Sequence, residues 1–217
     1  MWVSVPQLHA PFARYFRRRR FRWLAQIFSI GPQTTILDLG GYEYYWSYLD
    51  QRPRVTIVNL DLGGSHTSNF CWLAADARKL PFLDRSFDVV FANSIIEHVG
   101  DQESRYRFAR EVERVGRSYY IQTPNYWFPF EPHLLTPFIH FFPTRLKKIL
   151  LRNFTVWGLL VRPTRQGCEE FVRDVRLLNA KELQELFPKA RIHRERFLGF
   201  TKSLIAVSRE QGQEPGM

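Results

Sequence analysis

The segment between residues 35 and 99 constrains the fold of this chain most strongly. Short apolar runs of strand length recur in it, and Asp38, Asp61 and Asp76 follow in turn, the first two at the ends of such runs. Residues 87–94 form a further apolar run, with the length of a parallel strand that is buried on both faces. The carboxyl ends of parallel strands meet at one edge of an open α/β sheet, where ligands bind. The sequence therefore predicts several carboxylates along a ligand-binding edge.

Four motifs follow one another in this region. They are Ile36-Leu37-Asp38-Leu39-Gly40-Gly41, Asn59-Leu60-Asp61, Asp76-Ala77-Arg78-Lys79-Leu80-Pro81-Phe82, and a segment that begins Ser86-Phe87-Asp88. In this order they resemble the class I S-adenosylmethionine-dependent methyltransferases, in particular the small enzymes called type 11, over residues 34–133. The resemblance implies an α/β fold: a doubly wound, mostly parallel seven-stranded sheet, Rossmann-like, whose last strand is antiparallel. It also implies S-adenosyl-L-methionine as the cofactor.

The resemblance assigns cofactor contacts along the predicted edge. Asp38 lies near the methionine amino group in the family geometry, and Asp76 accepts a hydrogen bond from the adenine amino group. Asp61 can accept both ribose hydroxyls, as a strand-end carboxylate does in dinucleotide sites. Asn59 lies on the same side of the strand and takes this place if the strand ends earlier. The predicted cofactor-binding set is Asp38, Gly40, Gly41, Tyr42, Asn59, Asp61, Asp76, Ala77 and Asn93.

The glycine loop departs from the family pattern acid-x-Gly-x-Gly-x-Gly. The segment Asp38–Tyr44 keeps only the first of these glycines and adds Gly41. Glycine lets the backbone turn sharply and approach a ligand closely, so two tyrosines in this segment, Tyr42 and Tyr44, predict an altered loop. Two alternatives are open: the tyrosines close over the methionine part of the cofactor, or they pack beneath the loop.

Methyl transfer is a displacement at a sulfonium methyl, so it needs alignment, exclusion of water and, for some acceptors, a base. His98 follows the fourth predicted strand and His133 lies in a proline-punctuated loop after the fifth. Both are candidate catalytic bases, and a purely structural role is the alternative. No metal site is predicted, because Cys71 and Cys168 lack the spacing of metal ligands. The predicted substrate contacts are Asn125, Tyr126 and Glu131.

With 217 residues and 45% hydrophobic content, the chain is long enough to bury the core of one α/β domain. Apolar periodicity predicts helices over residues 8–29, 102–115 and 180–186 and a closing hairpin over residues 191–207, and a short helix is predicted over residues 43–50. We divide the domain into a basic helical cover, a cofactor-binding core, a substrate-lid insertion, a closing helix with the hairpin, and a disordered tail: residues 1–33, 34–124, 125–175, 176–209 and 210–217.

The net charge of +10 is unevenly distributed. No acid precedes Asp38, and the arginines before it are interleaved with aromatic residues. A second basic, aromatic region covers residues 138–165. Such patches favour phosphate-bearing substrates, anionic lipid or nucleic acid, and a solvated helix face is the alternative. The aromatic residues of the insertion are predicted mostly to pack on the sheet, and otherwise to line an apolar acceptor pocket: Trp127, Phe128, Phe130, Phe138, Phe141, Phe142 and Trp157.

We expect a small-molecule, glycan or lipid-linked acceptor and peripheral contact with an anionic membrane. Charged residues interrupt the most apolar stretch, so no membrane-spanning helix is expected, and the arginines of residues 17–20 leave no room for a signal-peptide core. Cytoplasmic location is the resulting expectation. An RNA methyltransferase and a non-catalytic cofactor-binding relative are the alternatives. Nucleic acid is the less favoured substrate, because the fourth strand ends Ala92-Asn93-Ser94-Ile95 instead of in an Asn/Asp-Pro-Pro-aromatic segment. A nicotinamide-dependent oxidoreductase is disfavoured, because its glycine fingerprint is absent.

Overall fold

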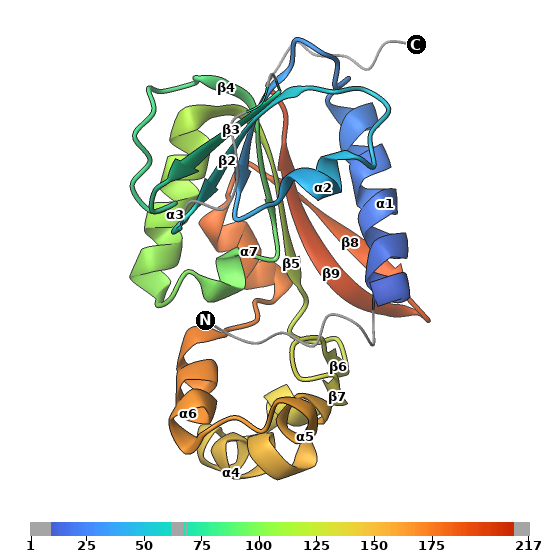
Figure 1. The fold of residues 1–217 in the computed structure, drawn as a ribbon, viewed down its shortest axis with the longest axis vertical. Helices are drawn as coiled ribbons and strands as arrows, with labels where there is room; N and C mark the ends of the chain where they lie inside the picture. The colour runs from blue at the N-terminus through green and yellow to red at the C-terminus, as the bar shows by residue number, and fades with distance from the viewer. Residues whose placement is uncertain (1–9, 62–66, 68, 211–217) are drawn as a thin grey trace.

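In the computed structural model of this chain, the structure describes residues 10–61, 67 and 69–210, with side chains from residue 14 onward. Seven strands form one sheet in the order β3-β2-β1-β4-β5-β9-β8 (Figure 1). The first five strands pair in parallel, and β9 runs antiparallel to both of its neighbours. The predicted fold class is therefore confirmed. The strands are β1 (Thr35–Leu39), β2 (Arg54–Asn59), β3 (Phe70–Ala74), β4 (Phe87–Asn93), β5 (Gly116–Pro124), β8 (Arg191–Phe197) and β9 (Phe200–Ser208).

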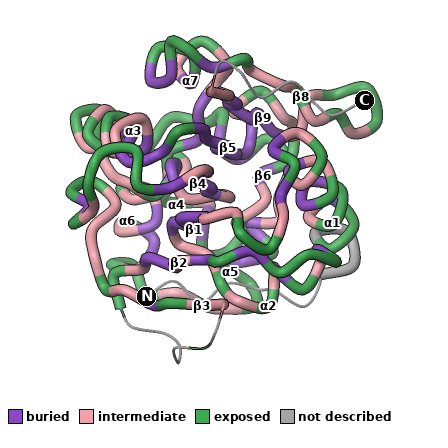
Figure 2. Tube along the Cα trace, turned by 90° about the horizontal axis from the view of Figure 1, so that it is seen from above, coloured by how far each residue is buried: buried purple, intermediate pink, exposed green. Residues whose placement is uncertain are grey.

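Helices cover both faces of the sheet. Helices α1 (Ala10–Ile27) and α2 (Glu43–Trp46) lie against one face, and α3 (Gln102–Val115) and α7 (Ala180–Leu186) lie against the other (Figure 1). Successive side chains of a strand point to opposite faces. Ile36 of β1 accordingly packs with the first pair of helices, and Leu37 packs with the second. Figure 2 shows that burial is concentrated in the central strands.

The insertion after β5 folds beyond the carboxyl ends of the parallel strands (Figure 1). It has its own small core, built from residues such as Leu134, Leu151 and Trp157. Pro143 precedes its first helix, and Thr155 and Thr164 cap the next two through their side-chain oxygens. Its elements are β6 (Phe130–Glu131), β7 (Thr136–Pro137), η2 (Ile139–Phe141), α4 (Thr144–Phe154), α5 (Val156–Val161) and α6 (Arg165–Asp174).

Two predicted elements end earlier than expected. The strand predicted to reach Asp61 ends at Asn59, because Asn59 pairs with Ala74, where β3 also ends, and Leu60 and Asp61 pair with no strand in the described part of the chain. The helix predicted over residues 43–50 is regular only to Trp46. The backbone then forms turns in which an amide donates to the carbonyl oxygen three residues earlier. The periodicity of residues 102–115 and 180–186 predicted α3 and α7 correctly.

The aromatic side chains of the insertion do not pack as predicted. Trp157 is buried, but Trp127 and Phe138 are 65% and 56% exposed. The reason is that the small core of the insertion consists mainly of other side chains, so these rings remain at its surface. Within the described ranges, no helix combines the length and the apolar character needed to cross a bilayer. The predicted tail lies outside the described residues except for Glu210.

Candidate cofactor and acceptor site

A glycine turn follows β1 and shapes the predicted cofactor edge. Gly40 has a φ of +72°, and a Cβ there would lie 2.1 Å from Cδ1 of Ile95. A Cβ on Gly41 would lie 1.9 Å from Oδ2 of Asp38. Both positions thus need glycine, the first for its left-handed backbone and the second because the backbone passes directly over the carboxylate. The turn leaves Asp38 buried beneath it.

Asp38 has one satisfied and one unsatisfied carboxylate oxygen. The indole Nε1 of Trp46 donates to Oδ2 over 2.8 Å, and Oδ1 has no hydrogen-bond partner among the described residues. Burial raises the pKa of Asp38 to about 7, although the Trp46 hydrogen bond opposes this shift. An ammonium group at Oδ1 would supply the missing donor and favour the ionised carboxylate. The site therefore fits the amino end of the predicted cofactor.

The other predicted cofactor residues lie along the same edge and differ in their burial and their hydrogen-bond partners. Asn59 donates from Nδ2 to the carbonyl oxygen of Gly41 over 3.1 Å, which ties β2 to the glycine turn. Asp61 is exposed, two residues past the end of β2. The backbone amide and the guanidinium of Arg78 donate hydrogen bonds to the carboxylate of Asp76. These hydrogen bonds hold the pKa of Asp76 below its usual value. The adenine and ribose contacts, and that of the partly buried Ala77, stay predictions.

Tyr42 and Tyr44 do not pack beneath the loop, because both are exposed, and their closure over the methionine part of the cofactor stays a prediction. The Tyr42 ring is 53% exposed and meets the rings of Tyr45 and Trp72 edge-on, at centroid distances of 6.2 and 6.4 Å. Tyr44 is 57% exposed and lies against Tyr45, 3.9 Å between centroids. The two tyrosines thus belong to a partly exposed aromatic group with Tyr45 and Trp72.

If Asp61 binds the ribose, Asp61→Ala should weaken binding of S-adenosylmethionine by about 1.5–3 kcal/mol, the worth of a hydrogen bond to a charged group. Titration calorimetry of the folded variant measures this directly. Asp50→Ala is the matched control, because Asp50 is also exposed but precedes the amino end of β2. Equal affinities for wild type and Asp61→Ala would remove Asp61 from the cofactor site.

A cavity of about 210 Å³ lies at the carboxyl ends of β4 and β5, and we call it the strand-end cavity. Asn93 and Ser94 form its side toward the glycine turn, and Phe16 of α1 lines it as well. The insertion adds apolar side chains such as Phe128 and Phe130. Arg17, Arg20 and Lys202 bring positive charge to the lining. The cavity can therefore receive a small group with apolar and anionic parts.

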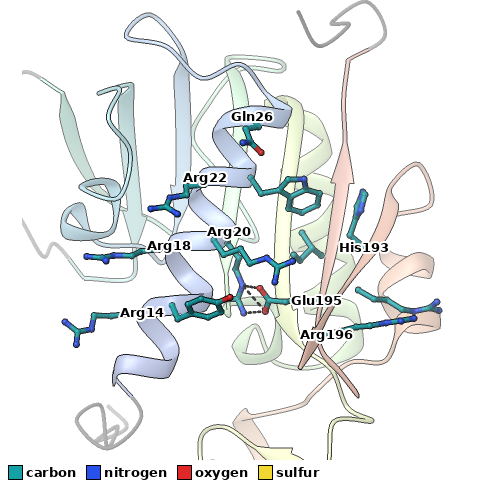
Figure 3. Close-up of a pocket in the computed structure, with 13 residues that line it drawn as sticks. Arg14, Arg18, Arg20, Arg22, Gln26, His193, Glu195 and Arg196 are labelled. Atoms are coloured by element: carbon teal, nitrogen blue, oxygen red, sulfur yellow. Dashed lines mark hydrogen bonds and ion pairs between the residues drawn. The ribbon is translucent and has the colours of Figure 1, made fainter. Parts of the chain in front are cut away.

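Arg20 occupies the centre of this region. Its Nη1 donates to Oδ1 of Asn93 (2.8 Å) and Oε1 of Gln122 (2.9 Å), and its Nη2 donates to Oε2 of Glu195 (2.6 Å) and Oγ of Ser203 (3.1 Å). Figure 3 shows Arg20 turned toward Glu195. The side chain joins α1 to four strands. The Asn93 side chain predicted to bind cofactor is thus held by Arg20, and its cofactor contact stays a prediction.

Arg20 is an exception to the interpretation of the N-terminal arginines as solvated or anion-binding, because it is buried. Arg20 is only 7% exposed, whereas Arg18 and Arg19 are exposed. The spacing held a signal: Arg20 lies four residues after Phe16 and four before Leu24, both of which are buried, so the three share one helix face. The side chain of Phe12, which the same interpretation used, lies outside the described side chains.

Lys202 is a functional candidate that sequence reasoning missed. Its Nζ lies 3.3 Å from Oε2 of Glu195 and 4.2 Å from the centre of the Phe16 ring. Burial and the nearby Arg20 lower the pKa of Lys202 to about 8, although Glu195 opposes the shift. An amine with such a pKa at the wall of the cavity can lose its proton near neutral pH, which suits a general base.

The two predicted catalytic histidines lie side by side, with ring centroids 5.0 Å apart. Nδ1 of His133 lies 2.7 Å from Oε1 of Glu131, and this carboxylate raises the pKa of His133 against the effect of burial. Desolvation by the surrounding protein and the charge of the neighbouring His133 lower the pKa of His98, although part of the His98 side chain is exposed. Only His133 of this pair lines the strand-end cavity.

The three predicted substrate residues contact other parts of the protein near the strand-end cavity. Nδ2 of Asn125 donates to the carbonyl oxygen of Thr201 over 2.8 Å, and the Tyr126 ring meets Trp127 edge-on. Glu131 is buried and acts through its contact with His133. None of the three predicted substrate residues is among the residues that line the strand-end cavity. Their direct contact with an acceptor stays a prediction.

Comparisons with known proteins match this geometry. Residues 37–119 match the family model described as a methyltransferase domain. Two uncharacterized proteins of Mycobacterium tuberculosis are 37% identical over 54 residues, which is 25% of this chain and 18% of theirs. The match therefore spans less than a fifth of the length of these relatives.

Solved structures share the whole fold. The PH0226 protein of Pyrococcus horikoshii has a TM-score of 0.55 at 16% identity, with 96% of this chain and 95% of that chain covered. A SAM-dependent methyltransferase of Aquifex aeolicus has a TM-score of 0.50 at 12% identity, with 86% and 87% covered. The family match includes Asp38 and the glycine turn, and the strand order is that of the implied fold. Residues 37–119 thus match a methyltransferase domain and the solved structures share the Rossmann-like fold, which supports a class I S-adenosylmethionine-dependent methyltransferase.

Proposed function

We propose that this chain transfers the methyl group of S-adenosylmethionine to an amphipathic, lipid-linked acceptor presented at an anionic membrane surface. The observation that carries this proposal is the group of exposed apolar residues on α4 and α5, together with the exposed cations of α4. Ile149 and Phe154 of α4 are each 68% exposed, and Leu159 and Leu160 of α5 are 60% and 55% exposed. We call these four residues the α4–α5 apolar surface.

The charges beside this surface suit anionic lipid. Helical geometry places Arg145, Lys148 and Arg152 on one side of α4, with Ile149 next to that side, whereas Phe154 at the end of the helix lies about 140° around the axis from Ile149. All three cations are exposed. A helix with exposed apolar residues and exposed cations can lie in a membrane interface, with the apolar residues inserted and the cations among anionic headgroups, each cation contributing about 1 kcal/mol.

The size of the strand-end cavity supports an acceptor that is only partly enclosed. About 210 Å³ is below the roughly 300–1,000 Å³ of pockets that enclose whole drug-sized ligands. The cavity therefore takes the reacting group, and the remainder of the acceptor extends outside. The insertion lines the cavity with Phe128 and Phe130 and also carries the α4–α5 apolar surface. One structural unit thus serves both the reacting group and the membrane.

The chain's own residues align the cofactor with the acceptor and exclude water. Bound S-adenosylmethionine provides an electrophilic sulfonium methyl. Asp38 holds the amino end of the cofactor beneath the glycine turn, and Asn93 is fixed by Arg20 at the wall shared with the strand-end cavity. α1 and the insertion exclude water from that cavity, and Lys202 can accept a proton from the acceptor.

A second candidate, methylation of RNA, is favoured by one surface. A cleft of about 1,200 Å³ lies between α1 and β8 and is lined by arginines (Figure 3). Arg14, Arg18, Arg22 and Arg196 all line it. Such a cleft can hold a chain of phosphates, and the binding would weaken steeply with salt.

Membrane binding tests the first proposal. The protein should sediment with phosphatidylglycerol vesicles more than with phosphatidylcholine vesicles, and less as salt rises. The double variant Ile149→Ser, Phe154→Ser should bind at least about tenfold more weakly, because burying each such side chain contributes about 1.5–3 kcal/mol. The matched control is Leu83→Ser with Leu198→Ser, at positions 83% and 80% exposed elsewhere on the molecule.

Product analysis separates the two candidates. With methyl-labelled cofactor and cell extract, we expect the label in the organic-solvent phase. Label in RNA would replace the lipid-linked acceptor with the second candidate. Equal, negligible sedimentation with both vesicle types would contradict the membrane surface in the first proposal.

A further inference from the structure

A cluster of three metal-ligating side chains lies beside the strand-end cavity. It consists of Glu97 and His98 from η1 (Ile96–His98) and His133 from the loop between β6 and β7. One carboxylate oxygen and one nitrogen from each ring lie within 4.8 Å of one another. We propose that Glu97, His98 and His133 bind a divalent transition-metal cation, with Zn²⁺ as the type ion.

The carboxylate of Glu97 has an unused oxygen in this cluster. Glu97 is 1% exposed, and the hydroxyl of Thr123 donates to its Oε2 over 3.0 Å. Its Oε1 has no hydrogen-bond partner within the described part of the chain. A buried carboxylate oxygen without a partner is costly, so it needs a ligand. A cation between Glu97 and the two imidazoles would satisfy it.

His133 is already oriented as a metal ligand. Oε1 of Glu131 lies 2.7 Å from its Nδ1, and the backbone amide of Leu134 donates to the other oxygen of Glu131 over 2.5 Å. The Glu131 contact leaves Nε2 as the nitrogen of His133 available to the cluster. A carboxylate behind a histidine is the usual outer shell of metal sites, where it fixes the ring and its tautomer. This second carboxylate distinguishes the cluster from a chance meeting of polar groups.

The ligand set defines the class of metal. Two imidazoles and one carboxylate suit Zn²⁺ and related first-row ions, whereas Mg²⁺ and Ca²⁺ prefer oxygen ligands alone. Three protein ligands also leave a coordination position open. Because His133 lines the strand-end cavity, an oxygen of an acceptor there could fill that position. The inference goes beyond the proposed function, since metal binding does not depend on the class of acceptor.

Metal titration tests the site without any activity measurement. Chelator-stripped, folded protein should take up one Zn²⁺ per chain in calorimetry, and Co²⁺ should give the visible absorption of a site with nitrogen and oxygen ligands. Glu97→Gln and His133→Gln should each weaken binding at least tenfold. Glu131→Gln, which leaves the three ligands in place, should weaken it by about 10–100-fold. His193→Gln, a histidine of β8 outside the cluster, should bind as wild type does.

Circular dichroism establishes that each variant is folded. Saturating Zn²⁺ should also raise the unfolding temperature of wild type, because a ligand of the native state stabilises it. Absence of stoichiometric uptake by folded wild type would overturn the proposal. So would unchanged affinity in folded Glu97→Gln and His133→Gln. If those two variants fail to fold, the Glu131→Gln and wild-type titrations decide the question.

Discussion

Arg20→Ala is expected to lower the free energy of unfolding by about 3–5 kcal/mol, because it removes one partner of a buried ion pair. Among the described residues, the substitution leaves Glu195 paired with Lys202 alone, and it takes a donor from the oxygens of Asn93 and Gln122. Unpaired buried acceptors add to the cost. Urea unfolding followed by circular dichroism measures the change.

Two comparisons isolate the ion pair. Arg19→Ala, at an exposed position of the same helix, should change the free energy by no more than about 0.5 kcal/mol. The double variant Arg20→Met, Glu195→Leu removes both charges and should cost less than Arg20→Ala alone. A loss below about 1 kcal/mol for Arg20→Ala would show that the buried network adds little to stability.

Affinity for S-adenosylmethionine is expected to fall about tenfold for each pH unit below 7, because the ammonium group needs an ionised Asp38 and burial raises its pKa to about 7. Asp38→Asn should bind more weakly at pH 8 and should lose this pH dependence. Asp76→Asn is a matched control for the pH dependence, since Asp76 has a lowered pKa and stays ionised across this range. Calorimetry between pH 5 and 8 measures all three proteins. A wild-type affinity that does not change with pH would contradict the role of Asp38.

The same group sets a pH dependence of stability with a defined sign. The pKa of Asp38 is higher in the folded protein than the usual 3.8, so the folded state binds the extra proton. Its contribution is fully present at low pH and is lost as pH rises from about 4 to 7, at about 1.4 kcal/mol per pH unit. The difference between wild type and Asp38→Asn, unfolded without cofactor, isolates this contribution. Bound cofactor should reduce it.

The fold and much of the cofactor edge could be predicted because their signals are local. Apolar runs of strand length, the helical period of residues 102–115 and the acid before Gly40 each depend on neighbours within a few positions. The end of β2 could not be predicted in this way, because it depends on where the neighbouring strand β3 stops. The apolar pattern continues past Asn59, but its pairing partners do not.

The sequence by itself determined the α/β class, the resemblance to a methyltransferase domain and the carboxylates at the carboxyl edge of the sheet, since periodicity and strand-end positions are properties of short segments. Only the tertiary structure decided that Arg20 is buried against Glu195, and that Glu97 meets His133. These pairs are separated by 175 and 36 positions, and each meeting depends on how helices and loops pack onto the sheet. Before packing, an arginine in a basic run and a histidine in a loop are in water. Burial then gives each a specific partner, because a desolvated charge needs one.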